Sequence, residues 1–309
     1  MTGKIPVTLI GGYLGAGKTT LVNHLLRNAD GRRLAVLVNE FGELPIDADL
    51  IEARDGNLLS ISGGCICCSF GSDLLGALMQ LKDRSDAFDH LLIETSGVAL
   101  PQSIVQSLSL LPDLAIDGVI VLADVETIEQ RARDRYMSDT VLAQLAHADI
   151  ILLNKADLVS PEQFDAVSRW LSDTVPGAHI VPTRKAEVPL EIVLGHYMRP
   201  KSVGDLTISP GHRHTADYET MSLDIDAPCD AGHLARHLAE AGLLRAKGFV
   251  RGPDGSFASL HVVGQRAAVE PAPDWIEGPG RIVCIGLTHQ INAPAISAAI
   301  KTCLITEAS

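Results

Sequence analysis

The stretch that decides the fold of this chain is Gly12-Tyr13-Leu14-Gly15-Ala16-Gly17-Lys18-Thr19, near the start of the 309-residue sequence. It matches the pattern G-x-x-x-x-G-K-[ST], in which a glycine-rich loop joins a strand to a helix. An apolar run, Pro6–Ile10, precedes it, and Lys18–Arg27 follows with apolar residues at helical spacing. The alternative is an ordinary glycine turn that caps a helix, but such a turn does not require a strand on one side and a helix on the other. The stretch therefore predicts a phosphate-binding loop.

The residue types in this loop suit a nucleoside triphosphate. Glycines let successive backbone N–H groups face the phosphates at the helix N-terminus. The Lys18 ammonium is expected to reach the β- and γ-phosphates, and the Thr19 hydroxyl is expected to hold Mg²⁺. The predicted nucleotide contacts of the loop are Gly12, Gly15, Ala16, Gly17, Lys18, Thr19 and Thr20.

Short apolar runs recur after this loop and alternate with helical patterns. Most runs are continuous, which is typical of parallel strands covered on both faces. The further strands predicted are Leu34–Asn39, Leu58–Ile61, Leu91–Glu94, Val119–Asp124, Ile150–Asn154 and His179–Pro182. The further helices predicted are Ser72–Leu81, Leu100–Leu108, Val125–His147 in one or two pieces, and Ser160–Leu171 with a capping box at its start. This alternation predicts an α/β fold with a doubly wound, mostly parallel P-loop sheet.

The pattern changes near Arg199–His214, where proline and glycine punctuate a polar stretch. Beyond it the predicted strands are Met221–Ile225, Gly248–Arg251, Ser259–Val263 and Arg281–Ile285, and the predicted helices are Asp230–Leu244 and Asn292–Leu304. We therefore predict a nucleotide-binding domain over residues 1–198, a linker over 199–215 and a small α+β domain over 216–309.

The segment Asn154-Lys155-Ala156-Asp157 follows the apolar run IILLN and indicates which base is bound. An aspartate carboxylate there can accept hydrogen bonds from N1–H and the 2-amino group of guanine, a donor pair that adenine lacks. Asn154 and the stem of Lys155 can steady the base and the loop. The segment favours GTP over ATP, and a small-molecule kinase that uses ATP is the alternative.

A strand-end carboxylate and a glycine occur together in Leu91-Leu92-Ile93-Glu94-Thr95-Ser96-Gly97. Glu94 is expected to act through the Mg²⁺ shell or to position water, and the Gly97 N–H can reach the γ-phosphate. With Lys18, these two residues form the predicted catalytic set. The sequence has no glutamine in a D-x-x-G-Q arrangement, so it does not assign the residue that orients the attacking water.

Three of the six cysteines lie within four positions, in Gly63-Gly64-Cys65-Ile66-Cys67-Cys68. Thiols this close cannot readily pair with one another, but they can supply soft ligands to a tetrahedral metal ion. The segment from Glu40 to Asp55 carries a net charge of −5, and Glu40, which closes the second strand, could complete a Cys–Cys–carboxylate site. A cluster of buried thiols and a redox role are the alternatives.

Charge and hydropathy exclude several classes of protein. The net charge is −13, which argues against nucleic acid as a partner because phosphate binding depends on clustered Lys and Arg. The longest apolar runs, such as Val119–Ala123, are far shorter than the ~20 residues of a membrane helix. No secretory signal is recognised, so we expect a cytoplasmic protein.

The remaining cysteines and several histidines are second-rank candidates. Isolated cysteines are usually buried apolar residues, which is what we expect of Cys229, Cys284 and Cys303. The sequence leaves open whether any of four histidines binds metal: His212, His214, His233 and His237. The last two have helical i, i+4 spacing, for which a partly exposed helix face is the simpler explanation.

The motifs GGYLGAGKTT, NEFGE, GGCICC, ETSG and NKAD occur in this order and closely resemble the CobW family of P-loop GTPases, relatives of the urease and hydrogenase nickel-insertion GTPases. The resemblance covers Ile5–Leu158 and continues more weakly through AKGFVRG and RIVCIG in the second domain. It implies a GTPase that binds a transition metal, often Zn²⁺ with Co²⁺ or Fe²⁺ as alternatives, and delivers it to a client metalloprotein. Implied roles are Lys18 and Thr19 for phosphate and Mg²⁺, Asn154 and Asp157 for guanine, Glu40, Cys67 and Cys68 for metal, and Cys65 as a further ligand.

One departure is the absence of the histidine-rich tract that many members carry. The resemblance names neither the client nor the physiological metal, and it leaves a homodimer open. We hypothesise that GTP and Mg²⁺ order the segment with Glu40 against Cys67 and Cys68, and that hydrolysis releases the ion. The rival hypothesis is a metal-sequestering or sensing protein in which nucleotide is a structural ligand.

Overall fold

The computed structural model describes residues 4–39, 59–63, 74, 76, 78, 88–195, 218–273, 276, 278–288 and 291–304. The chain divides into two compact units, residues 3–193 and residues 194–309. The division lies near the predicted domain boundary at residue 198. The predicted linker, residues 199–215, lies outside the described residues, so its limits stay a prediction.

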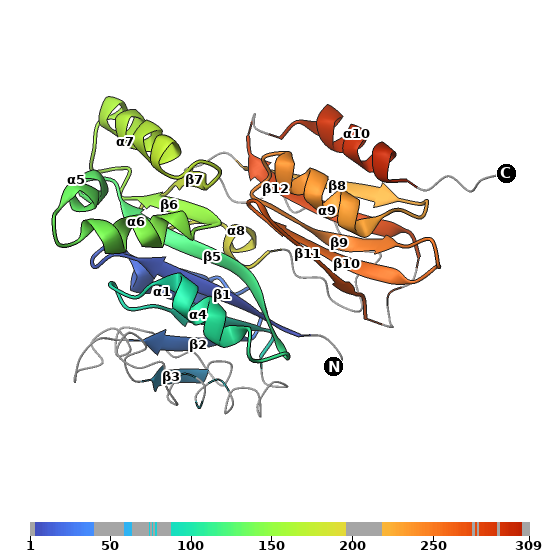
Figure 1. The fold of residues 1–309 in the computed structure, drawn as a ribbon, viewed down its shortest axis with the longest axis horizontal. Helices are drawn as coiled ribbons and strands as arrows, with labels where there is room; N and C mark the ends of the chain where they lie inside the picture. Colours follow the sequence, from blue (N-terminus) through green and yellow to red (C-terminus); the bar gives the residue numbers. More distant parts are fainter. Residues whose placement is uncertain are drawn as a thin grey trace. The chain divides into compact units, whose positions relative to one another are not determined.

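The first unit contains a sheet of seven parallel strands in the order β3-β2-β4-β1-β5-β6-β7 (Figure 1). The strands are β1 (Ile5–Gly12), β2 (Leu34–Asn39), β3 (Leu59–Gly63), β4 (His90–Glu94), β5 (Leu114–Asp124), β6 (Ile150–Asn154) and β7 (His179–Pro182). The helices with described bounds are α1 (Lys18–Arg27), α4 (Pro101–Leu108), α5 (Ile128–Arg133), α6 (Ser138–Ala146), α7 (Pro161–Thr174) and α8 (Leu190–Leu194). The predicted doubly wound α/β class is confirmed.

Apolar side chains cover both faces of this sheet, which explains the continuous apolar runs of the sequence. Every residue of β4 and β6 is buried. Ile93 and Leu153 lie in a core with Ile104 of α4 and Leu145 of α6. Their strand neighbours Leu92 and Leu152, which point to the opposite face, are also fully buried. Burying one such side chain contributes roughly 1.5–3 kcal/mol, so this packing stabilises the sheet on both sides.

The strand order changes direction at β1, which has β4 on one side and β5 on the other. Register partners place Leu9 beside Ile93 of β4 and beside Val119 of β5. In open α/β sheets ligands bind outside the carboxyl ends of the strands at such a point. The predicted phosphate-binding loop leaves the carboxyl end of β1 there.

Several predicted elements match the structure closely. α1, β2, β6 and β7 have the predicted bounds. The capping box of α7 is formed, because the Ser160 hydroxyl accepts from the Gln163 N–H at 3.3 Å and the Gln163 side chain accepts from the Ser160 N–H at 3.1 Å. The pattern over Val125–His147 is split into α5 and α6.

Other elements differ from the prediction. β5 begins at Leu114 instead of Val119, because its first residues pair with the start of β1 although Asp117 interrupts the apolar pattern. α8 was not predicted, and its five residues are too few for a helical period to show. Of the helix predicted over Ser72–Leu81, the described residues Leu74, Gly76 and Leu78 are helical.

The second unit has an antiparallel sheet of five strands in the order β11-β10-β9-β12-β8. The strands are β8 (Tyr218–Ile225), β9 (Arg245–Arg251), β10 (Phe257–Val263), β11 (Arg266–Pro271) and β12 (Gly280–Leu287), and the helices are α9 (Ala231–Glu240) and α10 (Ala293–Cys303). Leu234 and Leu238 of α9 and Ile296 of α10 pack with Leu260 and Ile282 of the sheet in one core. The predicted α+β class is confirmed.

Two local features of this unit correct the prediction. α9 ends at Glu240 instead of Leu244, because Gly242 follows in a left-handed conformation with φ of 75°. β11 was not predicted, since it is a largely exposed edge strand that returns from β10 through a tight turn.

Cys229, Cys284 and Cys303 are buried free thiols, as predicted. No helix in the described part of the chain is long and apolar enough to cross a membrane.

Candidate functional site

The loop between β1 and α1 has the backbone shape that the sequence predicted. Gly17 is the N-cap of α1 and adopts a left-handed conformation with φ of 107°. A Cβ atom on Gly17 would lie 2.6 Å from the Asn154 amide nitrogen, so only glycine fits there. The first turn of α1 has no acidic residue, which leaves the positive end of the helix suited to an anion.

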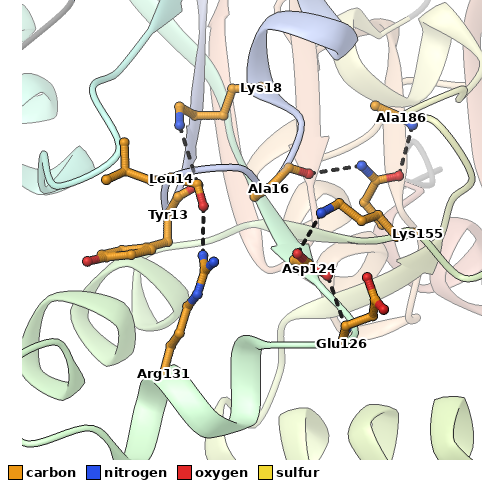
Figure 2. A network of polar contacts seen from close by, with 10 residues as sticks. Tyr13, Leu14, Ala16, Lys18, Asp124, Glu126, Arg131, Lys155 and Ala186 are labelled. Atoms are coloured by element: carbon orange, nitrogen blue, oxygen red, sulfur yellow. Dashed lines mark hydrogen bonds and ion pairs between the residues drawn. The ribbon is translucent and has the colours of Figure 1, made fainter. Parts of the chain in front are cut away.

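Lys18, the predicted phosphate-binding cation, contacts this loop. The Lys18 side chain is largely buried, and its ammonium nitrogen lies 3.5 Å from the Tyr13 carbonyl oxygen, to which it donates. Figure 2 shows Lys18 turned back over the loop. Of the other predicted contacts, Ala16 is buried, whereas Gly15 and Thr20 are exposed.

The structure brings the two predicted Mg²⁺ groups together. The Thr19 hydroxyl donates to a Glu94 carboxylate oxygen at 2.9 Å. Glu94 ends β4, and its residue is 1% exposed. It is the register partner of Ile10 in β1, which explains why a strand end distant in sequence meets the first turn of α1. Hydroxyl and carboxylate oxygens are the hard donors that Mg²⁺ prefers.

Gly97 lies against the phosphate-binding loop. A Cβ atom on Gly97 would come within 2.8 Å of the Leu14 backbone nitrogen, so the approach of the two segments requires glycine. The Gln144 amide holds this segment, donating to the Gly97 carbonyl at 3.1 Å and to the Ala99 carbonyl at 2.9 Å. Gln144 is buried in α6 and was not predicted from the sequence.

Asn154 connects the phosphate-binding loop to the loop after β7. Its amide nitrogen donates to the Ala16 carbonyl at 2.9 Å. Its amide oxygen accepts from the Ala186 N–H at 2.8 Å and from the Thr183 hydroxyl at 3.2 Å. Of the roles considered for Asn154, steadying the loop is therefore the one that its contacts support.

Lys155 and Asp157, which follow the end of β6, differ in their surroundings. Lys155 has a left-handed backbone, with φ of 64°, and its ammonium pairs with the Asp124 carboxylate at 2.7 Å. Asp124 also accepts from the Glu126 N–H at 3.1 Å, so this buried strand end fixes the Lys155 stem beside the loop (Figure 2). Asp157 is exposed, and its role in binding guanine stays a prediction.

An arginine that the sequence did not single out also supports the loop. Arg131 of α5 donates to the Leu14 carbonyl at 2.7 Å, and its guanidinium lies 4.9 Å from the centre of the Tyr13 ring (Figure 2). Arg131, Gln144, Thr183 and Ala186 have no motif of their own. For Thr183 a signal was available, because it directly follows a predicted strand at the same edge of the sheet.

The predicted metal ligands Glu40, Cys65, Cys67 and Cys68 lie outside the described residues, as do His212 and His214. The strand ends that lead to them are described. Asn39 at the end of β2 is the register partner of Gly63 at the end of β3. Its neighbour Val38 is the partner of Glu94. The chain therefore leaves the sheet toward Glu40 and toward the thiols from adjacent strands, next to Glu94.

Comparison with known families agrees with this geometry. Residues 6–182 match the model described as CobW/HypB/UreG, nucleotide-binding domain, and residues 218–304 match the cobalamin synthesis protein cobW C-terminal domain. The chain belongs to the CobW family. The predicted family and its P-loop GTPase class are thereby confirmed.

Three relatives illustrate how far the similarity to this family extends. The zinc chaperone CobW of a Sinorhizobium species is 30% identical, over 96% of this chain and 97% of its own. The zinc chaperone YjiA of Escherichia coli is 40% identical over 75% of each chain. The zinc-regulated GTPase metalloprotein activator 1 of Schizosaccharomyces pombe is 36% identical over 54% of this chain and 43% of its own.

We expect Gln144→Leu to impair turnover more than nucleotide binding in this CobW family member. The substitution leaves the Gly97 and Ala99 carbonyls without their donor, so the segment that presents the Gly97 N–H can shift. The kcat for GTP should fall about tenfold, less than the ~10²–10³-fold that follows outright loss of a transition-state donor. The unfolding free energy should fall by about 1–3 kcal/mol.

Steady-state kinetics and thermal unfolding check this expectation, with Gln130→Leu on the exposed face of α5 as the matched control. An unchanged kcat in the Gln144 variant, or an equal loss in the control, would show that Gln144 does not position the Gly97 segment.

Proposed function

We propose that this CobW family GTPase is a metallochaperone that binds a transition-metal ion, Zn²⁺ foremost, and delivers it to a client protein under the control of the GTP cycle. The cargo ion is held by Cys67, Cys68 and Glu40, with Cys65 as a further ligand. Two thiolates and a carboxylate form a donor set that suits Zn²⁺, while Co²⁺ and Fe²⁺ are chemically acceptable alternatives. The zinc chaperones among the relatives support the choice of zinc.

The single observation that carries the coupling is the register of neighbouring strand ends. Gly63, Asn39 and Glu94 end β3, β2 and β4, which are adjacent in the sheet, and β1 with the phosphate-binding loop comes next. A change at the γ-phosphate therefore acts on the strand ends from which the chain continues to Glu40 and to the thiols. GTPases use such segments, ordered with GTP and relaxed after hydrolysis, as switches.

The nucleotide half of this function uses the residues that surround the phosphate-binding loop. Backbone N–H groups from Gly12 to Thr20 and the Lys18 ammonium bind the phosphates, and the Asp157 carboxylate selects guanine. The Thr19 hydroxyl and the Glu94 carboxylate, 2.9 Å apart, fit Mg²⁺, which when bound would neutralise charge on the phosphates. Gly97 donates its N–H to the γ-phosphate.

We infer a reducing compartment, the cytoplasm, as the site of this activity. Thiols that load and release a metal ion must stay reduced, and disulfides persist in oxidising compartments. The client is a metalloprotein that receives the ion after hydrolysis.

We expect the protein to bind Zn²⁺ at least about tenfold more tightly with a non-hydrolysable GTP analogue than with GDP, which corresponds to about 1.4 kcal/mol of coupling. Competition with a chromophoric zinc chelator measures the affinity in each state. Cys67→Ser should abolish the nucleotide-dependent part, whereas Cys284→Ser, which removes a buried thiol of β12, should not.

Because coupling is reciprocal, Zn²⁺ should raise the affinity for the GTP analogue by the same factor. Equal zinc affinity in the two nucleotide states would refute control by GTP. Absence of GTP turnover with and without metal would instead favour the sequestering or sensing protein, in which nucleotide is a structural ligand.

A further inference from the structure

A second cation, Arg131, lies beside the phosphate-binding loop. It belongs to α5, the helix that follows β5, and β5 is the neighbour of β1 in the sheet. The two strands are parallel, and Gly12 at the end of β1 is the register partner of Leu122 near the end of β5. Their carboxyl ends therefore lie at the same edge of the sheet, where ligands bind in folds of this class. The topology thus brings Arg131 to the nucleotide site without a sequence motif.

The Arg131 guanidinium contacts the loop in two ways. It donates to the Leu14 carbonyl at 2.7 Å, and its central carbon lies 4.9 Å from the centre of the Tyr13 ring (Figure 2). The Lys18 ammonium donates to the preceding carbonyl, that of Tyr13, at 3.5 Å. The two cations therefore contact consecutive peptide groups of the loop. Since Lys18 is the expected partner of the β- and γ-phosphates, Arg131 lies next to the position expected of those phosphates.

Leu14 also joins Arg131 to Gly97. The Leu14 carbonyl accepts from Arg131, and the Leu14 backbone nitrogen would lie 2.8 Å from a Cβ atom on Gly97. The Gly97 N–H is the group predicted to donate to the γ-phosphate. Leu14 is 57% exposed, so this part of the loop is open to solvent. A nucleotide bound in the loop therefore has Lys18, Gly97 and Arg131 around the same end of its triphosphate.

Most of the hydrogen-bonding capacity of this guanidinium is unused. A guanidinium has five N–H donors, and the described contact of Arg131 with Leu14 uses one of its nitrogens. No carboxylate in the described part of the chain pairs with Arg131. By contrast, Arg133 of the same helix pairs with the Glu129 carboxylate. The charge and the remaining donors of Arg131 are thus available to an anion, and a planar guanidinium fits pairs of phosphate oxygens.

We propose that Arg131 is a catalytic residue for GTP hydrolysis in this chain and binds the γ-phosphate as its bond to the β-phosphate breaks. In this step a water oxygen bonds to the γ-phosphorus, and the electron pair of the broken bond stays on the bridging oxygen, which leaves with GDP. The guanidinium stabilises the charge that develops on these oxygens, as arginines do in other GTPases. The Leu14 carbonyl and the Tyr13 ring hold it in place beforehand, which makes the stabilisation effective.

Support of the loop alone is a weaker explanation of Arg131. Holding a carbonyl requires a donor but no charge, and at the exposed Leu14 a water molecule can serve as that donor. The two roles also predict different losses. A residue that only supports the loop affects the binding of every nucleotide, whereas a residue that acts in the transition state affects turnover selectively. The inference concerns GTP hydrolysis and does not rest on the proposed transfer of metal.

The test compares Arg131→Ala and Arg131→Lys with the wild type, as full chains without added zinc. Single-turnover hydrolysis of GTP should slow by about 10²–10³-fold in Arg131→Ala. The affinity for GDP with aluminium fluoride, a mimic of the transition state, should fall by the same factor, whereas Kd for GDP and for a non-hydrolysable GTP analogue should stay close to wild type. Arg131→Lys keeps the charge but not the paired donors, so it should retain part of the turnover.

Arg133→Ala is the matched control, because it removes an arginine of the same helix that already has a carboxylate partner. It should change neither the hydrolysis rate nor the three affinities. Circular dichroism verifies folding, and Arg131→Lys provides the same comparison if the alanine variant does not fold. A variant that hydrolyses GTP as fast as the wild type, or that loses affinity equally for GDP, the GTP analogue and the aluminium fluoride complex, would overturn the proposal.

Discussion

Asp157→Asn is expected to weaken GTP binding by at least about 100-fold and to create a preference for xanthosine triphosphate. Each hydrogen bond from guanine to a carboxylate contributes about 1.5–3 kcal/mol, so spoiling the pair costs no less than about 3 kcal/mol, or more than a hundredfold in Kd. The asparagine amide has nearly the same shape, but it offers one acceptor and one donor. Its donor would face the 2-amino group of guanine, and two donors cannot pair.

Xanthine turns this mismatch into a match, because it has a carbonyl where guanine has the 2-amino group. The test measures four Kd values: those of GTP and of xanthosine triphosphate, each with the wild type and with the variant. Asp165→Asn, an exposed carboxylate on α7, is the matched control and should leave both affinities unchanged. If the Asp157→Asn variant binds GTP as tightly as the wild type and binds xanthosine triphosphate no more tightly, Asp157 does not contact the base.

The elements that the sequence predicted well are those with strong local signals. β6 could be predicted because four apolar residues follow one another before Asn154, as expected of a strand with both faces buried. α7 begins where Ser160, Pro161 and Gln163 provide a cap, a rigid first residue and a reciprocal hydrogen bond. The start of α1 at Gly17 and Lys18 could also be predicted, because the G-x-x-x-x-G-K-[ST] pattern marks the point where a glycine-rich loop enters a helix.

The contacts that complete the site could not be predicted, because they join residues that are far apart in the sequence and belong to no common motif. Gln144 reaches the Gly97 carbonyl from another helix, and Arg131 reaches the Leu14 carbonyl across more than a hundred residues. Each is an ordinary polar residue of a helix until the fold brings its partner near. The same holds for Cys303, which the sequence marks only as a small buried residue and the fold places beside His237.

The order of the strands in the sheet links the local sequence patterns to the long-range contacts of the site. Parallel strands that end at one edge of a sheet bring their following residues together, whatever their distance in sequence. This rule explains why Glu94, which ends β4, lies beside Thr19 at the start of α1. Applied equally to Thr183, which follows β7, it would have found the loop that Asn154 holds.

Asn154→Ala should lower the unfolding free energy of the nucleotide-binding unit by about 2–5 kcal/mol and kcat/KM for GTP by about 100-fold. The residue is 3% exposed, and its amide pairs with the Ala16 carbonyl and the Ala186 N–H. Each buried group left unpaired costs about 1–3 kcal/mol. The catalytic loss follows because the Ala16 carbonyl belongs to the phosphate-binding loop, where a misplacement of about 1 Å can cost about 10²-fold.

A graded series separates this role from a general loss of stability. Thr183→Val removes one hydrogen bond to the Asn154 oxygen, at 3.2 Å, but leaves the Ala16 contact, so it should cost about 0.5–1.5 kcal/mol and leave turnover nearly intact. Asn28→Ala, at an exposed residue after α1, should change neither. Denaturant unfolding and GTP turnover measure the three variants. If Thr183→Val lost as much turnover as Asn154→Ala, the loop after β7, and not the tie to Ala16, would be what the active site requires.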